Sequence, residues 1–421
     1  MSLRRAAGRA ALVLGAATTG ILAVVAFDRV LGLVLPERWM SRALLFPPDV
    51  HFTLRTPEFE YEVRTNEFGF RGGPVAEPRQ GRMRIVAIGD SFTYGWGVDI
   101  SEAWPMVLER ALRARGLPVD VLDLGNPGAG PNGYADVVER ALPSLKPDLV
   151  VVGLLQGDDL MQSSAGGQAL LAGNSRSPDR FSRLLTRCFP TLSAVFTAAR
   201  ERRRRSPGNR AWWRELRVAF REGATQARAG FSAAERERYD RLEPEVRSLF
   251  ESGGLNPALV ALAMKVPDYF VSPLEEGTDA AALNQRGLAT ALTRIRVAAQ
   301  AAGARVVTVG IPYGFYVSAA AQERMGRLGF TVDKRALVSE APDRVVAAAA
   351  ADAGIAFFSP TAAFRREVPL RYFYFPWDNH FTREGHAFFA DQVLEYVASA
   401  LQAGSTEGVR TNATPPAPAG G

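Results

Sequence analysis

The chain has 421 residues, of which 47% are hydrophobic and 22% charged, so it has ordinary globular composition and can bury a full core in one large domain or two smaller ones. Its formal net charge is +6, but the basic residues are mostly arginines spread along the chain rather than clustered, which argues against a nucleic-acid partner. Cys188 is the only cysteine, which excludes an internal disulfide and a zinc site built on cysteines.

Residues 1–35 have the pattern of a membrane anchor. Three arginines among the first nine residues precede an uncharged stretch of 18 residues, Ala10 to Phe27. At about 1.5 Å per residue this stretch nearly spans a hydrocarbon core, and the arginines should stay cytoplasmic. We therefore expect a single-pass protein of the bacterial inner membrane, with the remaining residues in the periplasm or outside the cell.

Two other interpretations of this terminus stay open. It resembles a cleaved signal peptide, with Val24 and Ala26 at the small-residue positions before the cleavage site. It also fits a buried N-terminal helix of a cytosolic protein, although the flanking charges disfavour that interpretation.

Residues 36–80 contain little helical periodicity and several Pro, Gly and Phe residues. We expect an extended arm on the main domain, held by the apolar side chains of Phe68 and Phe70. Nothing in the sequence supports a contact between Arg71 and a substrate.

Residues 81–160 predict the first half of an α/β core. Apolar runs of strand length alternate with helical patterns, which is typical of right-handed βαβ units and a parallel sheet covered on both faces. The predicted strands are Arg84–Gly89, Val119–Gly125 and Leu149–Leu155, and the predicted helices are Trp104–Arg115 and Asn132–Leu142.

Residues 161–285 interrupt this alternation with helical patterns rich in Glu and Arg, the run Arg200–Arg205 and the pair Trp212–Trp213. We expect a helical insertion that caps the active edge of the sheet. A solvated charged helix packed elsewhere explains the pattern nearly as well. The arginine run also allows contact with anionic lipid or anionic polysaccharide.

The core resumes over residues 286–403, with helical patterns at Ala281–Ala302, Pro342–Ala353 and Arg383–Leu401 and strands at Ala304–Pro312 and Ile355–Ser359. Together with the first half this gives an α/β fold with a five-stranded parallel sheet sandwiched by helices. Residues 404–421 are small, polar and rich in proline, and we expect them to be disordered.

The predicted strand at Arg84–Gly89 ends in a Gly-Asp-Ser turn that presents Ser91 at the carboxyl edge of the sheet, where ligands bind in open α/β folds. A serine hydroxyl needs a histidine base and a group that orients this base. The three histidines are His51, His380 and His386. His51 lies before the strand pattern begins, whereas His380 and His386 fall just ahead of the last predicted helix. Asp378 and His380 on one loop could place a carboxylate against Nδ1 and leave Nε2 free for Ser91, which would give a triad in the chain order Ser, Asp, His.

Four segments then carry a resemblance to a known family: GDSFTYG, LGNPGAG, LLQGDDL and DNHFTREGH, in this order. They resemble the four blocks of the SGNH (GDSL-type) esterase and lipase superfamily, over roughly residues 60–160 and 290–400. The segment NEFGFRG is similar to the lead-in of membrane-anchored bacterial members. The resemblance implies a flavodoxin-like three-layer fold with Ser91 as nucleophile, His380 as base and Asp378 as its partner, although the family more often has D-x-x-H where this chain has D-x-H. His386 is expected to be a packed or solvated histidine.

The resemblance also implies an oxyanion hole made by the backbone N–H groups of Ser91 and Gly128 and by an asparagine that this chain replaces with Asp158. An ionised aspartate accepts hydrogen bonds but does not donate them. Three solutions are open: Asp158 is protonated, Gln156 supplies an amide, or backbone donors suffice. A fourth interpretation is an enzyme that is weak or has lost its activity.

We therefore expect a serine esterase, or an acyltransferase of the same chemistry, that needs no metal or cofactor. Its substrate would be an acyl ester, with acetyl the favoured acyl group, on an envelope glycan or a lipid. The alternative is a non-catalytic carbohydrate-binding or scaffold protein on the same fold. A metal-dependent hydrolase using Asp90, Asp158 and Asp159 is disfavoured because the chain lacks an H-E-x-x-H motif.

Overall fold

The computed structural model of the protein describes residues 2–35, 45–75, 79, 81–163, 188–196 and 216–410. These residues belong to two compact units. The smaller unit comprises Met1–Ala43 and Ser175–Ala211, and the larger unit comprises Leu44–Asn174 and Trp212–Gly421. The sheet and the candidate site lie in the larger unit.

In the smaller unit, helix α1 (Ser2–Val34) contains the stretch that was predicted to span a membrane. Asp28, directly after that stretch, is buried and accepts hydrogen bonds from the backbone N–H groups of Thr191 and Leu192. Within the described residues, no helix combines the length and the apolar character needed to cross a membrane. The predicted membrane helix therefore has no support in the structure.

The larger unit is built on a parallel sheet with the strand order β4-β3-β5-β6-β7. Each strand matches its predicted range to within a residue, which confirms the predicted five-stranded parallel sheet. The strands are β3 (Met83–Gly89), β4 (Val119–Gly125), β5 (Leu149–Leu155), β6 (Arg305–Ile311) and β7 (Ala356–Phe358).

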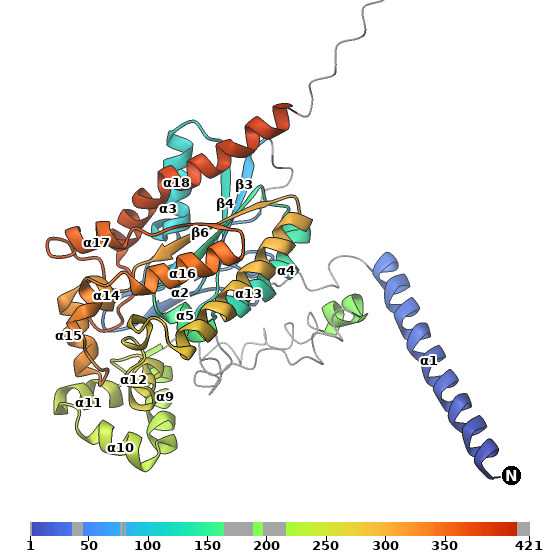
Figure 1. The fold of residues 1–421 in the computed structure, drawn as a ribbon, viewed down its shortest axis with the longest axis horizontal. Coiled ribbons are helices and arrows are strands. Elements are labelled where there is room, and N and C mark those ends of the chain that lie inside the picture. The colour runs from blue at the N-terminus through green and yellow to red at the C-terminus, as the bar shows by residue number, and fades with distance from the viewer. Residues whose placement is uncertain are drawn as a thin grey trace, which may run out of the picture. The chain divides into compact units, whose positions relative to one another are not determined.

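Helices cover both faces of this sheet (Figure 1). On β3, Ile85 and Ala87 belong to one apolar core, and the alternate residues Val86 and Ile88 belong to the other. This alternation follows from the two-residue period of a strand and gives the three-layer arrangement. The first core includes α3 (Trp104–Ala114) and α18 (Arg383–Arg410), and the second includes α4 (Pro131–Leu145), α13 (Asp279–Ala301) and α16 (Ala341–Asp352).

Helix α18 is longer than the sequence predicted. Residues 404–410 continue this helix, so the expectation that disorder begins at residue 404 was wrong. No proline follows Pro376 until Pro415, and the backbone can therefore keep its helical hydrogen bonds through Arg410. The rest of the expected tail, residues 411–421, lies outside the described residues.

The predicted arm contains an antiparallel hairpin of β1 (His51–Arg55) and β2 (Glu60–Arg64). Phe70 is buried in the second core and stacks on the ring of Phe68, as expected for the residues that hold the arm. The hairpin itself buries an apolar cluster against the helix that follows β3. This cluster is formed by Leu54, Phe59, Tyr61, Val63 and Tyr94.

Arg71 ties the arm to the same helix. Its buried guanidinium donates hydrogen bonds of 2.7–2.9 Å to four backbone carbonyl groups. One carbonyl belongs to Glu62 of the arm, and the others belong to Tyr94, Gly95 and Val98. These contacts give Arg71 a structural role between the arm and the turn after β3.

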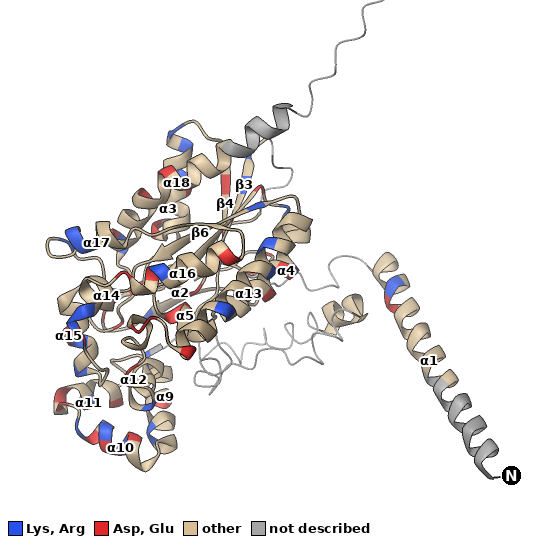
Figure 2. Ribbon diagram, viewed as in Figure 1, with Lys and Arg blue, Asp and Glu red and all other residues tan. Residues whose placement is uncertain are grey.

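The described part of the predicted insertion is helical, although Arg200–Arg205 and Trp212–Trp213 lie outside the described residues. Both signs of charge are interspersed on its helices (Figure 2), and pairs such as Arg228 with Glu251 neutralise each other. The helices are α9 (Leu216–Gly230), α10 (Ala233–Asp240), α11 (Pro244–Glu251) and α12 (Pro257–Lys265). Further short helices are η2 (Ile100–Glu102), α5 (Asp158–Ser163), η5 (Ser272–Leu274), α14 (Gly314–Val317), α15 (Ala319–Arg327), η6 (Lys334–Leu337) and α17 (Thr361–Glu367).

Asp123 on β4 makes stability depend on pH. Its carboxyl group is buried, and only one of its oxygens has a hydrogen-bond partner among the described residues, the N–H of Gly125 at 2.8 Å. Burial raises the pKa of Asp123 to about 7 from 3.8. Between these two values the unfolded chain loses a proton that the folded chain keeps, so this group lowers the free energy of unfolding as pH rises.

We predict that Asp123→Asn stabilises the protein at pH 8, because the amide keeps the bond from Gly125 and removes the cost of a buried charge. The gain in the free energy of unfolding should be on the order of 4 kcal/mol at pH 8 and much smaller at pH 4.5. Urea unfolding at both pH values measures it. The control is Asp120→Asn on the same strand, which breaks an ion pair with Arg113 and should destabilise at pH 8. Equal effects of Asp123→Asn at the two pH values would contradict the prediction.

Candidate active site

Ser91 begins the short helix α2 (Ser91–Tyr94) directly after β3. The preceding residue, Asp90, caps this helix, because its side chain accepts a 2.9 Å hydrogen bond from the N–H of Phe92. The helix packs so tightly on the end of β4 that a Cβ atom at Gly125 would collide with the backbone nitrogen of Tyr94. The strand, turn and helix therefore fix Ser91 at the carboxyl edge of the sheet.

The structure brings Ser91, His380 and Asp378 together as the sequence predicted. Nε2 of His380 lies 2.6 Å from Oγ of Ser91, and Nδ1 of the same ring contacts Oδ1 of Asp378. The carboxylate therefore holds the imidazole so that Nε2 faces the serine hydroxyl.

A tight loop explains how the D-x-H spacing produces this geometry. Asn379, between the acid and the base, has a φ of 64°, in the left-handed region that asparagine tolerates better than most residues. The N–H of Asn379 donates to the carbonyl of Phe375, and the N–H of Phe375 donates to the carbonyl of His380. These bonds turn the chain so that Asp378 and His380 meet although only one residue separates them.

Acidic groups around His380 control its protonation. Burial by itself would lower the pKa of the imidazole, but the negative charges of Asp378, Asp90 and Asp158 outweigh burial and raise this pKa above 6.5. The neutral imidazole, which is the form that can accept a proton from Ser91, is therefore favoured only at higher pH than for a free histidine.

The other two histidines do not join this group. His386 is fully buried, and its Nδ1 accepts a hydrogen bond of 3.2 Å from the N–H of Trp104 at the start of α3. Burial lowers the pKa of His386 to about 3, which keeps it neutral and confirms the predicted packed histidine. His51 lies on the arm hairpin, 3.3 Å from a carboxylate oxygen of Glu62.

Two backbone N–H groups, those of Ser91 and Gly128, were predicted to donate hydrogen bonds to an oxyanion. Gly128 has a φ of 77° and is exposed in the turn after β4. Neither its N–H nor that of Ser91 donates a hydrogen bond to any residue that the structure describes. Both groups are thus free for a ligand within the described part of the chain.

Asp158, at the first position of α5, already has donors of its own. Its Oδ1 accepts a 2.8 Å hydrogen bond from the hydroxyl of Tyr269, and its Oδ2 accepts one of 2.5 Å from Nε2 of Gln162. Burial raises the pKa of Asp158, whereas these bonds and the nearby His380 oppose the rise. Tyr269 comes from the chain segment after α12, and no motif in the sequence indicated its contact with Asp158.

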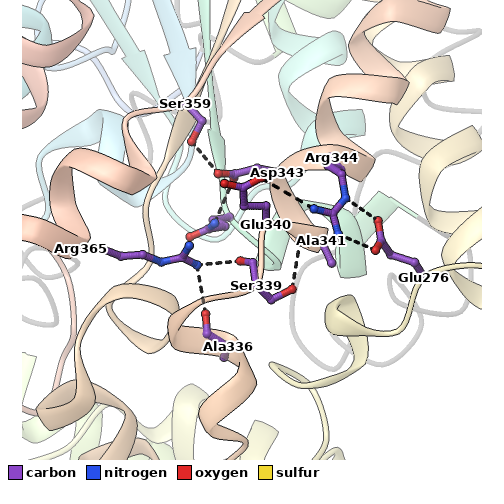
Figure 3. A network of polar contacts seen from close by, with 10 residues as sticks. Glu276, Ala336, Ser339, Glu340, Ala341, Asp343, Arg344, Ser359 and Arg365 are labelled. Carbon is purple, nitrogen blue, oxygen red and sulfur yellow. Dashed lines mark hydrogen bonds and ion pairs between the residues drawn. The ribbon is translucent and has the colours of Figure 1, made fainter.

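The side-chain amide of Gln156 forms hydrogen bonds with residues other than those around Ser91. Its Nε2 lies 3.0 Å from Oδ1 of Asp343 and 3.3 Å from Oγ1 of Thr361. Asp343 also accepts a hydrogen bond from Ser359 and is part of the polar network in Figure 3. The interpretation in which the Gln156 amide faces an oxyanion is therefore not supported.

Asp159 and Asp90 complete the acidic surroundings. Asp159 is fully buried and accepts hydrogen bonds from the hydroxyl of Tyr134 at 2.9 Å and from the N–H of Leu155 at 2.8 Å. Burial raises its pKa well above 3.8, and burial with repulsion from Asp158 raises the pKa of Asp90 to about 7. Among the described residues, no group of three or more His, Cys, Asp or Glu side chains has the arrangement of a metal site.

Solved structures that resemble the chain include the lipase/acylhydrolase from Enterococcus faecalis, which is 13% identical over 76% of this chain and 96% of that chain with a TM-score of 0.35. The acetyl xylan esterase AlAXEase is 12% identical over 75% of this chain and 100% of that chain, with a TM-score of 0.34. AlinE4, an SGNH-hydrolase family esterase, is 28% identical over 29% of this chain and 55% of that chain, with a TM-score of 0.18. These similarities are too low to carry a functional argument. No protein with a curated description matches the chain.

A family model gives the informative match. Residues 87–242 match the GDSL-like Lipase/Acylhydrolase family, a range that contains Ser91, Gly128 and Asp158 but ends before Asp378 and His380. This match supports a GDSL/SGNH hydrolase domain in the chain.

Proposed function

We propose that the protein is a serine esterase that removes an acyl group, with acetyl the favoured one, through an acyl-Ser91 intermediate. The observation that carries the proposal is the continuous contact from the Ser91 hydroxyl through His380 to Asp378. These are the three groups that nucleophilic acyl transfer requires, in the order it requires them.

The geometry leads to the following steps. Oγ of Ser91 attacks the ester carbonyl carbon while Nε2 of His380 takes the hydroxyl proton, and Asp378 stabilises the imidazolium that forms. His380 then gives the proton to the departing alcohol, which leaves an acyl-serine. A water molecule attacks this ester with His380 again as base, and the acid product and free Ser91 are released. The N–H groups of Ser91 and Gly128 stabilise the negative oxygen in both halves.

The alcohol part of the substrate is a second component of the proposal. An envelope glycan or a lipid ester fits the periplasmic location expected from the N-terminal sequence, and a sugar hydroxyl in place of water would make the same site an acyltransferase. The binding-protein alternative depends on Asp158, whose charge would repel an oxyanion. Labelling of the serine distinguishes this alternative from an enzyme.

We predict that a fluorophosphonate probe labels the full-length protein at Ser91 and that the protein hydrolyses p-nitrophenyl acetate. Ser91→Ala should abolish labelling and reduce hydrolysis by about a thousandfold or more, because the attacking oxygen is absent. Intact-mass spectrometry measures the label, and absorbance of the released nitrophenol measures the rate. Labelling that persists in Ser91→Ala, or its absence in the wild type, would contradict the proposal.

We predict that kcat/KM increases with pH with a midpoint above 6.5. The acidic groups raise the pKa of His380, so the protonated and inactive imidazole persists to higher pH than in a free histidine. Asp378→Asn should lower kcat by about a thousandfold or more, because it removes the group that holds the ring. A pH–rate profile of the wild type measures the midpoint, and a midpoint at or below 6.5 would contradict the predicted effect of the acidic groups.

We predict that Asp158→Asn preserves or raises kcat. The asparagine amide is a neutral donor, whereas the carboxyl group can donate only while it is protonated, so the variant should also lose any decline of the rate at alkaline pH. The measurement is kcat against pH for both proteins, with melting temperatures as the control for folding. A loss of about a hundredfold in a folded variant would instead assign the carboxyl group a positive role in catalysis.

A further inference from the structure

The tip of the arm hairpin touches the loop that carries Asp378 and His380. Glu58 lies between β1 and β2, and its two carboxylate oxygens accept separate hydrogen bonds from consecutive backbone N–H groups of this loop. Oε1 lies 2.8 Å from the nitrogen of Trp377, and Oε2 lies 2.7 Å from the nitrogen of Asp378. The two segments are about 320 residues apart in the chain.

We propose that Glu58 is a positioning residue that holds the Asp378–His380 pair in line with Ser91; this inference rests on the proposed esterase function. Hydrogen bonds between N–H groups and a carboxylate are about twice as strong as bonds between neutral groups. Here two of them fix two successive peptide planes, that of the Pro376–Trp377 bond and that of the Trp377–Asp378 bond. The orientation of Asp378, and through it that of the His380 ring, depends on these planes.

Residues next to Glu58 reinforce the same contact. Phe59 packs against Phe375 with ring centroids 4.8 Å apart, and Phe375 is the residue whose N–H donates to the carbonyl of His380. Phe59 and Tyr61 also pack against Trp96, whose ring centroid lies 6.1 Å from that of His380. The hairpin therefore contacts the loop and the ring that packs near His380.

The charges around Glu58 make this contact sensitive to pH. Asp378 repels the carboxylate, Arg324 attracts it, and the hydroxyl of Tyr372 also feels its charge. Burial is the largest influence, and the pKa of Glu58 is raised above its usual range. Protonation removes the negative charge and turns one carboxylate oxygen into a hydroxyl, which is a much weaker acceptor for an N–H group. Acidification should therefore weaken the contact in addition to protonating His380.

The test compares Glu58→Gln with Glu60→Gln in the full-length protein. Glutamine at position 58 keeps the size of the side chain but replaces one acceptor with a donor. Glu60 lies on the same hairpin but is exposed and pairs with Arg55, so its substitution is the matched control. With p-nitrophenyl acetate, Glu58→Gln should lower kcat about ten- to hundredfold with little change in KM, because a misplaced catalytic group costs rate rather than binding. Glu60→Gln should match the wild type.

The pH profile separates a positioning role from a general loss of stability. The acid limb of log kcat against pH should be steeper than one protonation in the wild type and in Glu60→Gln, and should have unit slope in Glu58→Gln. Glu58→Asp, which is too short to reach both N–H groups, should lower kcat in the same way and serves if the glutamine variant does not fold. Equal kcat values and equal slopes in folded Glu58 and Glu60 variants would overturn the inference.

A spectroscopic measurement keeps this inference distinct from the esterase proposal. The proton on Nδ1 of His380, held by Asp378, should give a low-field proton NMR signal in the wild type and in Ser91→Ala. Glu58→Gln should shift or broaden this signal, whereas Glu60→Gln should leave it unchanged. If the wild type hydrolyses no ester but the signal responds in this way, the esterase proposal fails while the positioning role stands. A signal that is indifferent to Glu58→Gln overturns the positioning role even in an active enzyme.

Discussion

The hydrogen bond between Ser91 and His380 is the contact on which the rest of the site depends. Its partners are 289 residues apart, so neither local sequence nor one element can create it. Parallel pairing of β3 between β4 and β5 fixes the carboxyl end of β3, and the loop before α18 returns the chain to that end. The sheet is thus the frame that turns two distant segments into one catalytic surface.

The carboxyl groups near this hydrogen bond together raise the pKa of His380, but their own burial is unfavourable. Asp378 alone would favour the imidazolium that forms as Ser91 attacks, and Asp90 and Asp158 add to that effect. The cost is the burial of these carboxyl groups, which raises the pKa values of Asp90, Asp158 and Asp159, and repulsion between carboxylates adds to the rise for Asp90 and Asp159. The fold tolerates these three carboxyl groups because each of them accepts hydrogen bonds from the protein and because their raised pKa values favour the protonated, neutral forms.

The sequence allowed the sheet and the triad to be predicted for different reasons. Buried parallel strands are continuous apolar runs, and such runs have a local signal that marked all five strands. The triad could be predicted because the chain has only three histidines, and one of them, His380, follows an aspartate on a predicted loop. The contacts of Tyr269 with Asp158 and of Glu58 with the late loop had no such signal, because they join segments whose own residues are ordinary. The predicted membrane helix rested on an uncharged stretch and the arginines before it, and it found no support among the described residues.

The arm belongs physically to the catalytic unit, although the matched family range begins only at residue 87. Arg71 binds four backbone carbonyls, three of them in the turn that follows Ser91, and Glu58 binds two backbone N–H groups in the loop that carries His380. The cationic side chain of Arg71 donates hydrogen bonds to several carbonyl groups, and the anionic side chain of Glu58 accepts hydrogen bonds from two N–H groups. Each therefore satisfies polar backbone groups that irregular turns leave without partners of their own. Because the two side chains come from one hairpin and its continuation, a segment that contains neither nucleophile nor base contacts the backbone next to both of them.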